Sequence, residues 1–429
     1  MIQVRMRKST PRSVPIERVS KHDGVVRRNF ALNVLDGALF TLGINLVSRQ
    51  AVLPLLVTQI GGGAIAVSLI TVLWTVGFYL PQFLIAGRVG REPRKKRLML
   101  RTAVAQRLPW LCMALLAAFG LERVSADVGL ISFFAVFGLA AVMGSLSVPV
   151  WFEMVAKLTP VRLRGRMFGL RVIFSGLFGM GAGWAAEFIL ERMAYPDSFA
   201  LLFVLAFVMM IGSYVCLALL EENEDAPTDG VSYADIVRRI PSILRHEPNF
   251  RNFLVADVLL MASLSAEAFY AVHAFERFGL SSGFAGRFTA VLMASSVIGS
   301  VVFGYLGDRI GHRLNLALMG ASTALACTVA VLAPGVEAYY LVFVGASFAT
   351  TLQLISRLPI VAEICGERDR PIYLALANIV SSPFALCGLL AGWLAQSAGY
   401  TPVFLVLGGM ALCALLWLLL FVREPRTIA

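Results

Sequence analysis

Three polar side chains recur at helical spacing inside an apolar segment near residue 350. They stand at positions i, i+3 and i+7, which places them on one face of a helix: Thr350, Gln353 and Arg357. The guanidinium supplies a fixed positive charge, because arginine stays protonated in proteins. A polar face in an apolar helix predicts a surface that is turned away from lipid.

A second stripe, made by Ser263, Glu267 and Tyr270, has the spacing i, i+4, i+7. Charges inside membrane helices cost about 2.5 to 3.5 kcal/mol at the helix centre on insertion scales, so each should face a cavity or a partner. If both stripes face one chamber, Glu267 brings a titratable acid and Arg357 a fixed cation into it. The alternative is a structural ion pair or snorkelling to the interface.

The first apolar segment carries polar residues on two nearly opposite faces. Asn33 and Asp36 share one face, and Asn45 and Arg49 share the other, so the two pairs cannot line the same cavity. Asp36 lies close to the end of its helix, which favours helix packing over proton coupling. Arg49 lies deeper and is a candidate for binding an anionic group. For Glu187 both a structural and a functional role stay open.

Further candidates for a solute pocket come from other apolar segments. Asn378 lies beside two serines, at a point where Pro383 can loosen the helix. An aromatic-lined pocket could form from Trp74, Tyr79, Gln82 and Trp151. Tryptophans near the ends of such segments are more often interface anchors.

The elements that must position these residues are membrane-spanning helices. Of the 429 residues, 58% are hydrophobic and only 15% are charged, which excludes an ordinary soluble protein. Each span needs about 20 apolar residues, so the chain can hold about twelve. The predicted spans are residues 30–57, 63–87, 98–121, 128–155, 167–190, 198–220, 252–276, 284–307, 314–333, 338–362, 372–396 and 402–422.

The net charge of +11 is explained by topology. Most of the 37 basic residues gather in the N-terminal tail and in alternate loops, which fall on one side if the N-terminus is cytoplasmic. This pattern follows the positive-inside rule and argues against a nucleic-acid patch. It predicts a multi-pass protein of the cytoplasmic (inner) membrane with both termini cytoplasmic.

The two halves of the chain share short sequence matches at corresponding positions. Arg28-Asn29-Phe30 enters the first span as Arg251-Asn252-Phe253 enters the seventh, which favours a duplication of six spans. The expected organisation is a basic tail (1–27), an N-terminal bundle (28–220), a cytoplasmic linker (221–250), a C-terminal bundle (251–422) and a short cytoplasmic tail (423–429).

The run from Gly304 to Arg313 reads Gly-Tyr-Leu-Gly-Asp-Arg-Ile-Gly-His-Arg and joins two spans. Its fixed positions follow the pattern G-x-L-x-D-R-x-G-x-R and are Gly304, Leu306, Asp308, Arg309, Gly311 and Arg313. The run resembles the cytoplasmic loop signature of the major facilitator superfamily. The resemblance implies an all-α membrane fold of twelve helices in two pseudo-symmetric bundles. It also implies a central cavity that opens alternately to each side, lined mainly by spans 1, 4, 7 and 10.

The same resemblance implies loop contacts that lock the outward-open state. Asp308 should face the N-terminus of span 5 near Arg166, with a charge that suits the helix dipole. In the first half, Arg91 stands where the superfamily pattern has the aspartate. Because Asp369 opens span 11, we expect a charge-inverted contact between Arg91 and Asp369.

These observations predict a secondary transporter that moves a small solute by alternating access, with proton coupling through an acid such as Glu267. No nucleotide-binding loop is present, and efflux is slightly favoured over nutrient or metabolite uptake because the aromatic and apolar content is high. A sensor or scaffold would need a larger soluble region than residues 221–250.

The cysteines and histidines show no metal-ligand spacing, and no nucleophile and base form a pattern, so we expect neither a cofactor nor an enzyme. The expected partners are a small-molecule substrate and membrane lipid, with no nucleic acid, and a monomer is compatible with the sequence.

Overall fold

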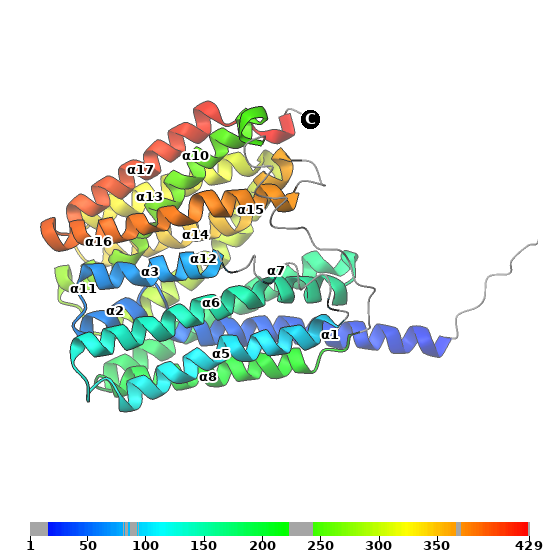
Figure 1. Cartoon of the computed structure of the whole chain (residues 1–429), viewed down its shortest axis with the longest axis horizontal. Helices are drawn as coiled ribbons and strands as arrows, with labels where there is room; N and C mark the ends of the chain where they lie inside the picture. Colours follow the sequence, from blue (N-terminus) through cyan, green and yellow to red (C-terminus); the bar gives the residue numbers. More distant parts are fainter. Residues whose placement is uncertain are drawn as a thin grey trace, which may run out of the picture.

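The chain folds into helices that cross a membrane. The computed structural model describes residues 16–79, 81, 85, 92, 94–222, 243–365 and 370–427. Ten helices in these ranges are long and apolar enough to span a bilayer, and Ala64–Phe78 is a shorter apolar helix. One further crossing is made jointly by the helices Ile16–Leu46 and Val52–Ile60. The described residues contain no strand, and the expected all-α fold of twelve spans is confirmed (Figure 1).

The first six spans form one bundle, which we call the N-bundle. Its helices are α1 (Ile16–Leu46), α2 (Val52–Ile60), α3 (Ala64–Tyr79), α5 (Lys95–Phe119), α6 (Ala126–Leu158), α7 (Val161–Arg192) and α8 (Asp197–Ala218). α1 packs against α7 and α8, and α5 packs against α6 and α8. α1 begins at Ile16, within the segment expected as a tail, so the first span continues a longer helix.

The last six spans form the C-bundle. Its elements are α10 (Pro248–Ser263), η1 (Leu264–Ala266), α11 (Glu267–Phe278), α12 (Phe284–Ile310), α13 (His312–Leu332), α14 (Val336–Ile364), α15 (Arg370–Ser381), η2 (Ser382–Leu386), α16 (Cys387–Ala398), α17 (Tyr400–Phe421) and η3 (Pro425–Thr427). α13 packs against α14 and α17, and α10 packs against α17.

In the described ranges, three spans are broken part-way. α1 ends at Leu46 and α2 resumes at Val52, so Arg49 and Gln50 lie between the two helices. The seventh span changes to a 3₁₀ turn at η1, and the eleventh changes at η2, where Pro383 removes a backbone donor. The expected loosening of the helix at Pro383 is confirmed.

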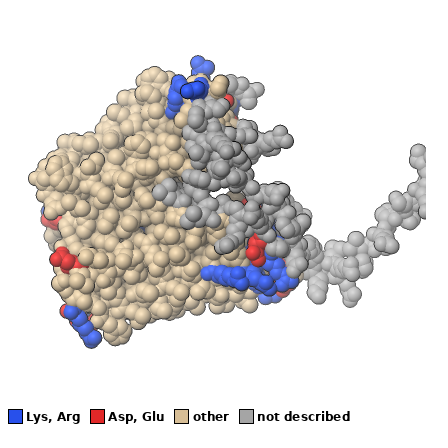
Figure 2. All heavy atoms as spheres, viewed as in Figure 1, with Lys and Arg blue, Asp and Glu red and all other residues tan. Residues whose placement is uncertain are grey.

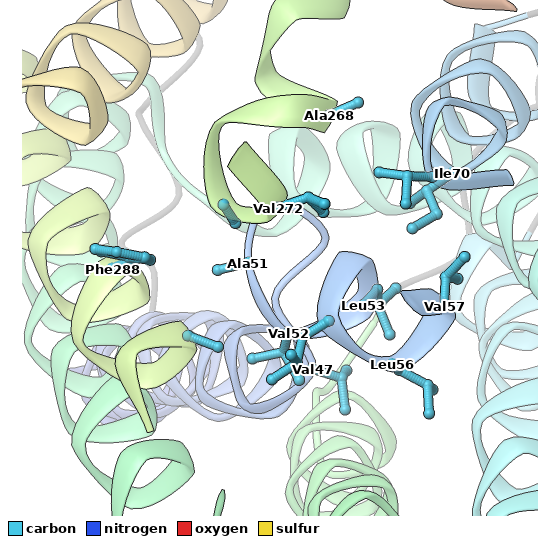
Figure 3. Packing of buried hydrophobic residues seen from close by; sticks show 14 of the residues in the cluster. Val47, Ala51, Val52, Leu53, Leu56, Val57, Ile70, Ala268, Val272 and Phe288 are labelled. Atoms are coloured by element: carbon cyan, nitrogen blue, oxygen red, sulfur yellow. The ribbon is translucent and has the colours of Figure 1, made fainter. Parts of the chain in front are cut away.

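The hydrophobic core is shared at one end of the molecule. The largest buried cluster includes residues of both bundles, and Figure 3 shows Ala51, Val52, Val272 and Phe288 among them. Two separate clusters lie toward the other end. One contains Phe250 and other C-bundle residues, and the other consists of N-bundle residues. The bundles therefore pack together at one end, which we call the closed end.

The opposite end, where α1 begins and α17 ends, we call the basic end. Its larger clusters of Lys and Arg side chains are visible in Figure 2. α7 runs from the basic end to the closed end, and α12 runs back beside it. Near the closed end the two helices touch through glycines, since a Cβ at Gly183 would lie 2.8 Å from Ala290 Cα. Toward the basic end, a Cβ at Gly169 or Gly304 would meet nothing within 4 Å.

At the basic end, paired hydrogen bonds tie the first helix of each bundle to the chain just after its last helix. Asn29 donates to Glu221 O (2.9 Å) and accepts from Glu221 N (3.0 Å). Asn249 donates to Arg423 O (3.0 Å) and accepts from Arg423 N (2.8 Å). The sequence match of Asn29 with Asn252 is therefore wrong by three residues, because Asn249 makes the equivalent bonds.

Candidate functional site: a cavity between the two bundles

A cavity of about 110 Å³ lies between the bundles. The N-bundle lines it with Arg49, Thr71, Trp74, Thr75 and Phe78, and the C-bundle residues that line it include Ser265, Glu267, Thr350 and Gln353. The breaks in the first and seventh spans place Arg49, Ser265 and Glu267 there. Both bundles therefore contribute polar groups to one small space.

Glu267 is the most deeply buried charge in this cavity, with 5% of its side chain exposed. Its Oε2 accepts a hydrogen bond from Gln50 Nε2 (2.9 Å) and lies 3.8 Å from Arg49 Nη2, so the contacts join the two bundles. Its Oε1 is buried and has no donor. A buried acceptor without a donor is costly, so this oxygen can take a proton or a donor from a bound solute.

Arg49 and two aromatic rings form the N-bundle wall of the cavity. The Arg49 guanidinium lies over Trp74, 5.8 Å from the ring centroid. Trp74 in turn stacks on Phe78, with centroids 5.5 Å apart. A quarter of the Arg49 side chain is exposed, so the cation is accessible as well as paired. The expected roles of Arg49 and Trp74 stay predictions, but their position in a cavity fits them.

The C-bundle wall holds part of the predicted stripe on α14. Thr350 Oγ1 donates to Ala346 O (3.1 Å), which fixes its hydroxyl orientation. Gln353 Nε2 contacts Met261 Sδ at 3.2 Å, a weak acceptor. A solute with a better acceptor could compete for this amide. Thr350, Gln353 and Glu267 are thus brought together.

Arg357 is not part of this cavity. Its Nε and Nη2 each donate to an Asp257 carboxylate oxygen at 2.8 Å, and its Nη1 donates to Asn378 Oδ1 at 2.7 Å. Ser381 also donates to Asp257, which is 2% exposed. The expectation that Glu267 and Arg357 share one chamber is therefore corrected: Arg357 lies one turn further along α14 and pairs inside the C-bundle.

Tyr270 also points away from the cavity. Its hydroxyl lies 3.4 Å from Cys327 Sγ, and its ring stacks on Phe404 with centroids 5.4 Å apart. Ser263 bonds back to Leu260 O inside its own helix. The 3₁₀ turn η1 explains the difference, because it turns the chain by about 120° per residue and destroys the i, i+4, i+7 alignment. The side chain of Gln82 lies outside the described residues.

Comparison with known proteins agrees with the observed arrangement of two helical bundles. Residues 258–429 match the sequence model of a family described as Major Facilitator Superfamily. No curated protein matches the chain by sequence. A D-xylose–proton symporter structure superposes with a TM-score of 0.70 at 14% identity, covering 94% of this chain and 99% of that one.

The structure of a mutant of the nucleoside transporter NupG gives a TM-score of 0.72 at 10% identity, covering 93% of this chain and 100% of the other. A POT family transporter, in complex with a thioalcohol-conjugated peptide, gives 0.70 at 13% identity, covering 93% and 96%. The sequence match covers the C-terminal part of the chain, and the whole chain has the fold of these transporters.

The signature loop contacts the C-terminal tail. Gly311, at φ 109°, makes the turn between α12 and α13, a conformation that favours glycine. Arg426 donates to the backbone oxygens of Gly307 (3.1 Å) and Asp308 (2.8 Å). Arg313 donates through its guanidinium to Leu418 O (3.0 Å) and Leu419 O (2.7 Å), and Arg309 lies 5.1 Å from the Tyr305 ring. The loop is thereby held against the C-bundle.

The predicted loop contacts across the bundles are not formed here. Asp308 and Arg166 are both exposed, and no hydrogen bond or ion pair joins them in the described chain. Arg91 and Asp369 lie outside the described residues. Both contacts are expected for a state closed at the basic end, whereas the bundles of this structure pack together at the other end.

One cluster in the N-bundle was missed by the sequence. Asp36 Oδ2 accepts from Arg171 Nη1 (2.9 Å), and Asp36 Oδ1 accepts from Ser213 Oγ (2.7 Å). Arg107 Nη2 donates to the same Ser213 (2.8 Å). The four residues come from four helices far apart in sequence, and no spacing rule connects them.

Proposed function

We propose that this chain is a secondary transporter that binds a small polar solute in the interbundle cavity and carries it by alternating access. The observation that carries the proposal is the unpaired Oε1 of Glu267, in a cavity that both bundles line. A site shared by two bodies changes its exposure when those bodies move relative to each other.

The cavity lining favours a polar solute over a large amphipathic one. Three threonines, a serine, a glutamine, an arginine and a glutamate supply hydrogen-bonding groups around a space of about 110 Å³. Glu267 Oε1 suits a hydroxyl or amine donor, and Arg49 suits an anionic group. The aromatic pair Trp74 and Phe78 can cover an apolar face of the solute. This lining supports uptake or exchange of a small metabolite more than efflux of apolar compounds.

The bundle packing supports an inward-facing state. The shared core, the glycine contact of α7 with α12, and the hydrogen bond from Gln59 to Ser282 (3.2 Å) lie toward the closed end. By the positive-inside rule, the basic end is cytoplasmic. A reporter enzyme that is active only outside the cytoplasm should be silent when it is fused after Ala429. Activity of that fusion would reverse the orientation.

We assign proton coupling to Glu267. When ionised, it accepts from Gln50 and attracts Arg49, and this contact holds the closed end together. A proton on the carboxyl weakens the ionic part of that contact and supplies a donor of its own. Protonation therefore favours release of the closed end, which links the proton gradient to the conformational change.

The experiment begins with purified protein screened against small polar solutes by melting shift. A hit is then tested in proteoliposomes for accumulation driven by a pH gradient and for counterflow exchange. Wild type should do both, and Glu267→Gln should keep counterflow but lose pH-driven accumulation. Glu276→Gln is the matched control, since Glu276 lies on the same helix, is exposed and bonds to Tyr400.

Two outcomes would contradict parts of this proposal. If Glu267→Gln keeps the full pH dependence, another group carries the proton. If wild type shows no counterflow with any solute that stabilises it, the chain does not transport those solutes.

A further inference from the structure

The N-bundle contains a second pocket, separate from the interbundle cavity. We call it the N-bundle pocket; its volume is about 140 Å³, and its lining includes Asp36, Arg107, Arg171 and Trp151. These side chains come from α1, α5, α7 and α6. Asp36 and Arg107 are each 2% exposed, so the pocket places formal charges in the interior of a membrane-spanning bundle.

The charges of this pocket do not balance. Both oxygens of Asp36 are occupied, one by Arg171 and the other by Ser213. Arg107 reaches Asp36 only through Ser213, to which it donates at 2.8 Å. Its other bonds go to neutral backbone oxygens, Met210 O (2.7 Å) and Ala103 O (3.0 Å). Two cations thus share one carboxylate.

No second acid compensates for this surplus among the described lining residues of the pocket. Glu153 is the nearest acid along α6, but it stands two residues after Trp151, on a different face of the helix, and is exposed. An uncompensated positive charge in the interior of a membrane bundle is unfavourable, because neither lipid nor packed side chains solvate it. The pocket therefore favours a negative ligand.

Hydrogen-bond donors also point to an anion. Trp151 Nε1 is buried and has no acceptor, and an indole nitrogen can only donate. The Trp151 ring lies over the Arg171 guanidinium, 4.5 Å from its centre. Arg171 donates through Nη1 to Asn33 O and to Asp36, so its other nitrogens remain for a ligand. A water molecule could accept from the indole, but it would leave the surplus charge in place.

We propose that the N-bundle pocket binds a small monovalent anion, either a halide such as chloride or a carboxylate group, at Trp151 Nε1 beside the Arg171 guanidinium and near Arg107. The site lies within one bundle, so its occupancy stabilises that bundle in every state of a transport cycle. It is independent of the solute cavity and of any role of Glu267.

The test measures the melting temperature of the purified full chain in increasing sodium chloride or sodium acetate, with sodium gluconate of equal ionic strength as the reference. We expect a saturable rise with chloride, acetate or both, relative to the larger gluconate. A rise with chloride supports a halide as the ligand, and a rise with acetate supports a carboxylate group. No rise above gluconate with either salt would overturn it.

Two variants give opposite expected effects. Trp151→Phe keeps an aromatic ring over Arg171 but removes the donor, so the half-saturating anion concentration should rise about tenfold. Asp36→Asn increases the positive surplus, so that concentration should fall several-fold. Trp184→Phe is the control, since Trp184 is 60% exposed on α7 and should leave the titration unchanged.

An unchanged half-saturating concentration in Trp151→Phe would overturn the proposal. The Trp151 result does not depend on Asp36→Asn, so the test survives if the Asp36 variant fails to fold.

Discussion

Glu222 and Glu424 hold equivalent positions in the two bundles, where each carboxylate caps the N-terminus of the third span of its bundle, α5 or α13. Glu222 accepts from Lys95 N and Lys96 N, both at 2.8 Å, and Glu424 accepts from Arg313 N at 3.2 Å. A carboxylate at this position satisfies free backbone N–H groups and suits the positive end of the helix dipole.

Loss of the Glu222 cap should destabilise the N-bundle. Glu222 also accepts from Lys157 Nζ (2.9 Å), and only 3% of its side chain is exposed. Glu222→Gln should therefore cost about 1 to 2 kcal/mol and lower the melting temperature in detergent. Glu221→Gln is the control, because the Glu221 side chain is half exposed. An equal loss in both variants would refute the cap.

The glycine contact at the closed end should be sensitive to added side chains. Gly183→Val would place methyl groups against Ala290 and push α7 from α12, so the closed end should open. The distance between spin labels at Gln59→Cys and Ser282→Cys, in a background without native cysteines, should lengthen. Gly181→Val is the matched control, since a Cβ at Gly181 meets nothing within 4 Å. Equal distances in the two variants would contradict the prediction.

The Asp257–Arg357 pair should be structural. Arg357→Gln leaves a buried carboxylate without its main cation and should cost about 3 to 5 kcal/mol. The double change Asp257→Asn with Arg357→Gln removes both charges and should recover part of that stability. Thermal melting measures both variants. If the double variant is no more stable than Arg357→Gln, the pair does not act as a charge-compensating unit.

The predicted contact between Arg91 and Asp369 is tested by exchanging the charges of the two residues. Arg91→Asp should impair transport, because the state closed at the basic end loses its attraction to Asp369. Exposed ion pairs contribute only about 0 to 1 kcal/mol, which still shifts an equilibrium between states of similar energy. Asp369→Arg in the same chain should restore part of the counterflow rate. A double variant that is no better than either single one would show that the contact does not form.

The sequence predicts the spans well because their signal is local. Apolar length and alternating basic loops identify the twelve crossings, and Pro383 marks one helix break through its missing donor. The break at η1 has no such mark: Leu-Ser-Ala is compatible with a regular helix. As a result, Ser265 lines the cavity where the helical spacing predicts Ser263.

Residue partners are harder to predict than residue positions. Glu267 was recognised as a buried acid, but its partners Arg49 and Gln50 lie in a break of the first span, where no helical face can be assigned. Arg357 has two plausible acids on the seventh span, and only the three-dimensional packing selects Asp257 over Glu267. The spacing of residues along one helix predicts which face a side chain occupies. To predict an ion pair, the distance between two helices must also be known.

The ties at the basic end also constrain how the molecule moves. In each bundle the first helix is joined to the chain after its last helix through Asn29 or Asn249. That segment is joined to the third span, α5 or α13, through Glu222 or Glu424. Helices joined in this way cannot separate one at a time. Each bundle should therefore rotate as a rigid body about the shared core. Distances across the two ends should then be anticorrelated, and a switching rate measured at one end should equal the rate at the other.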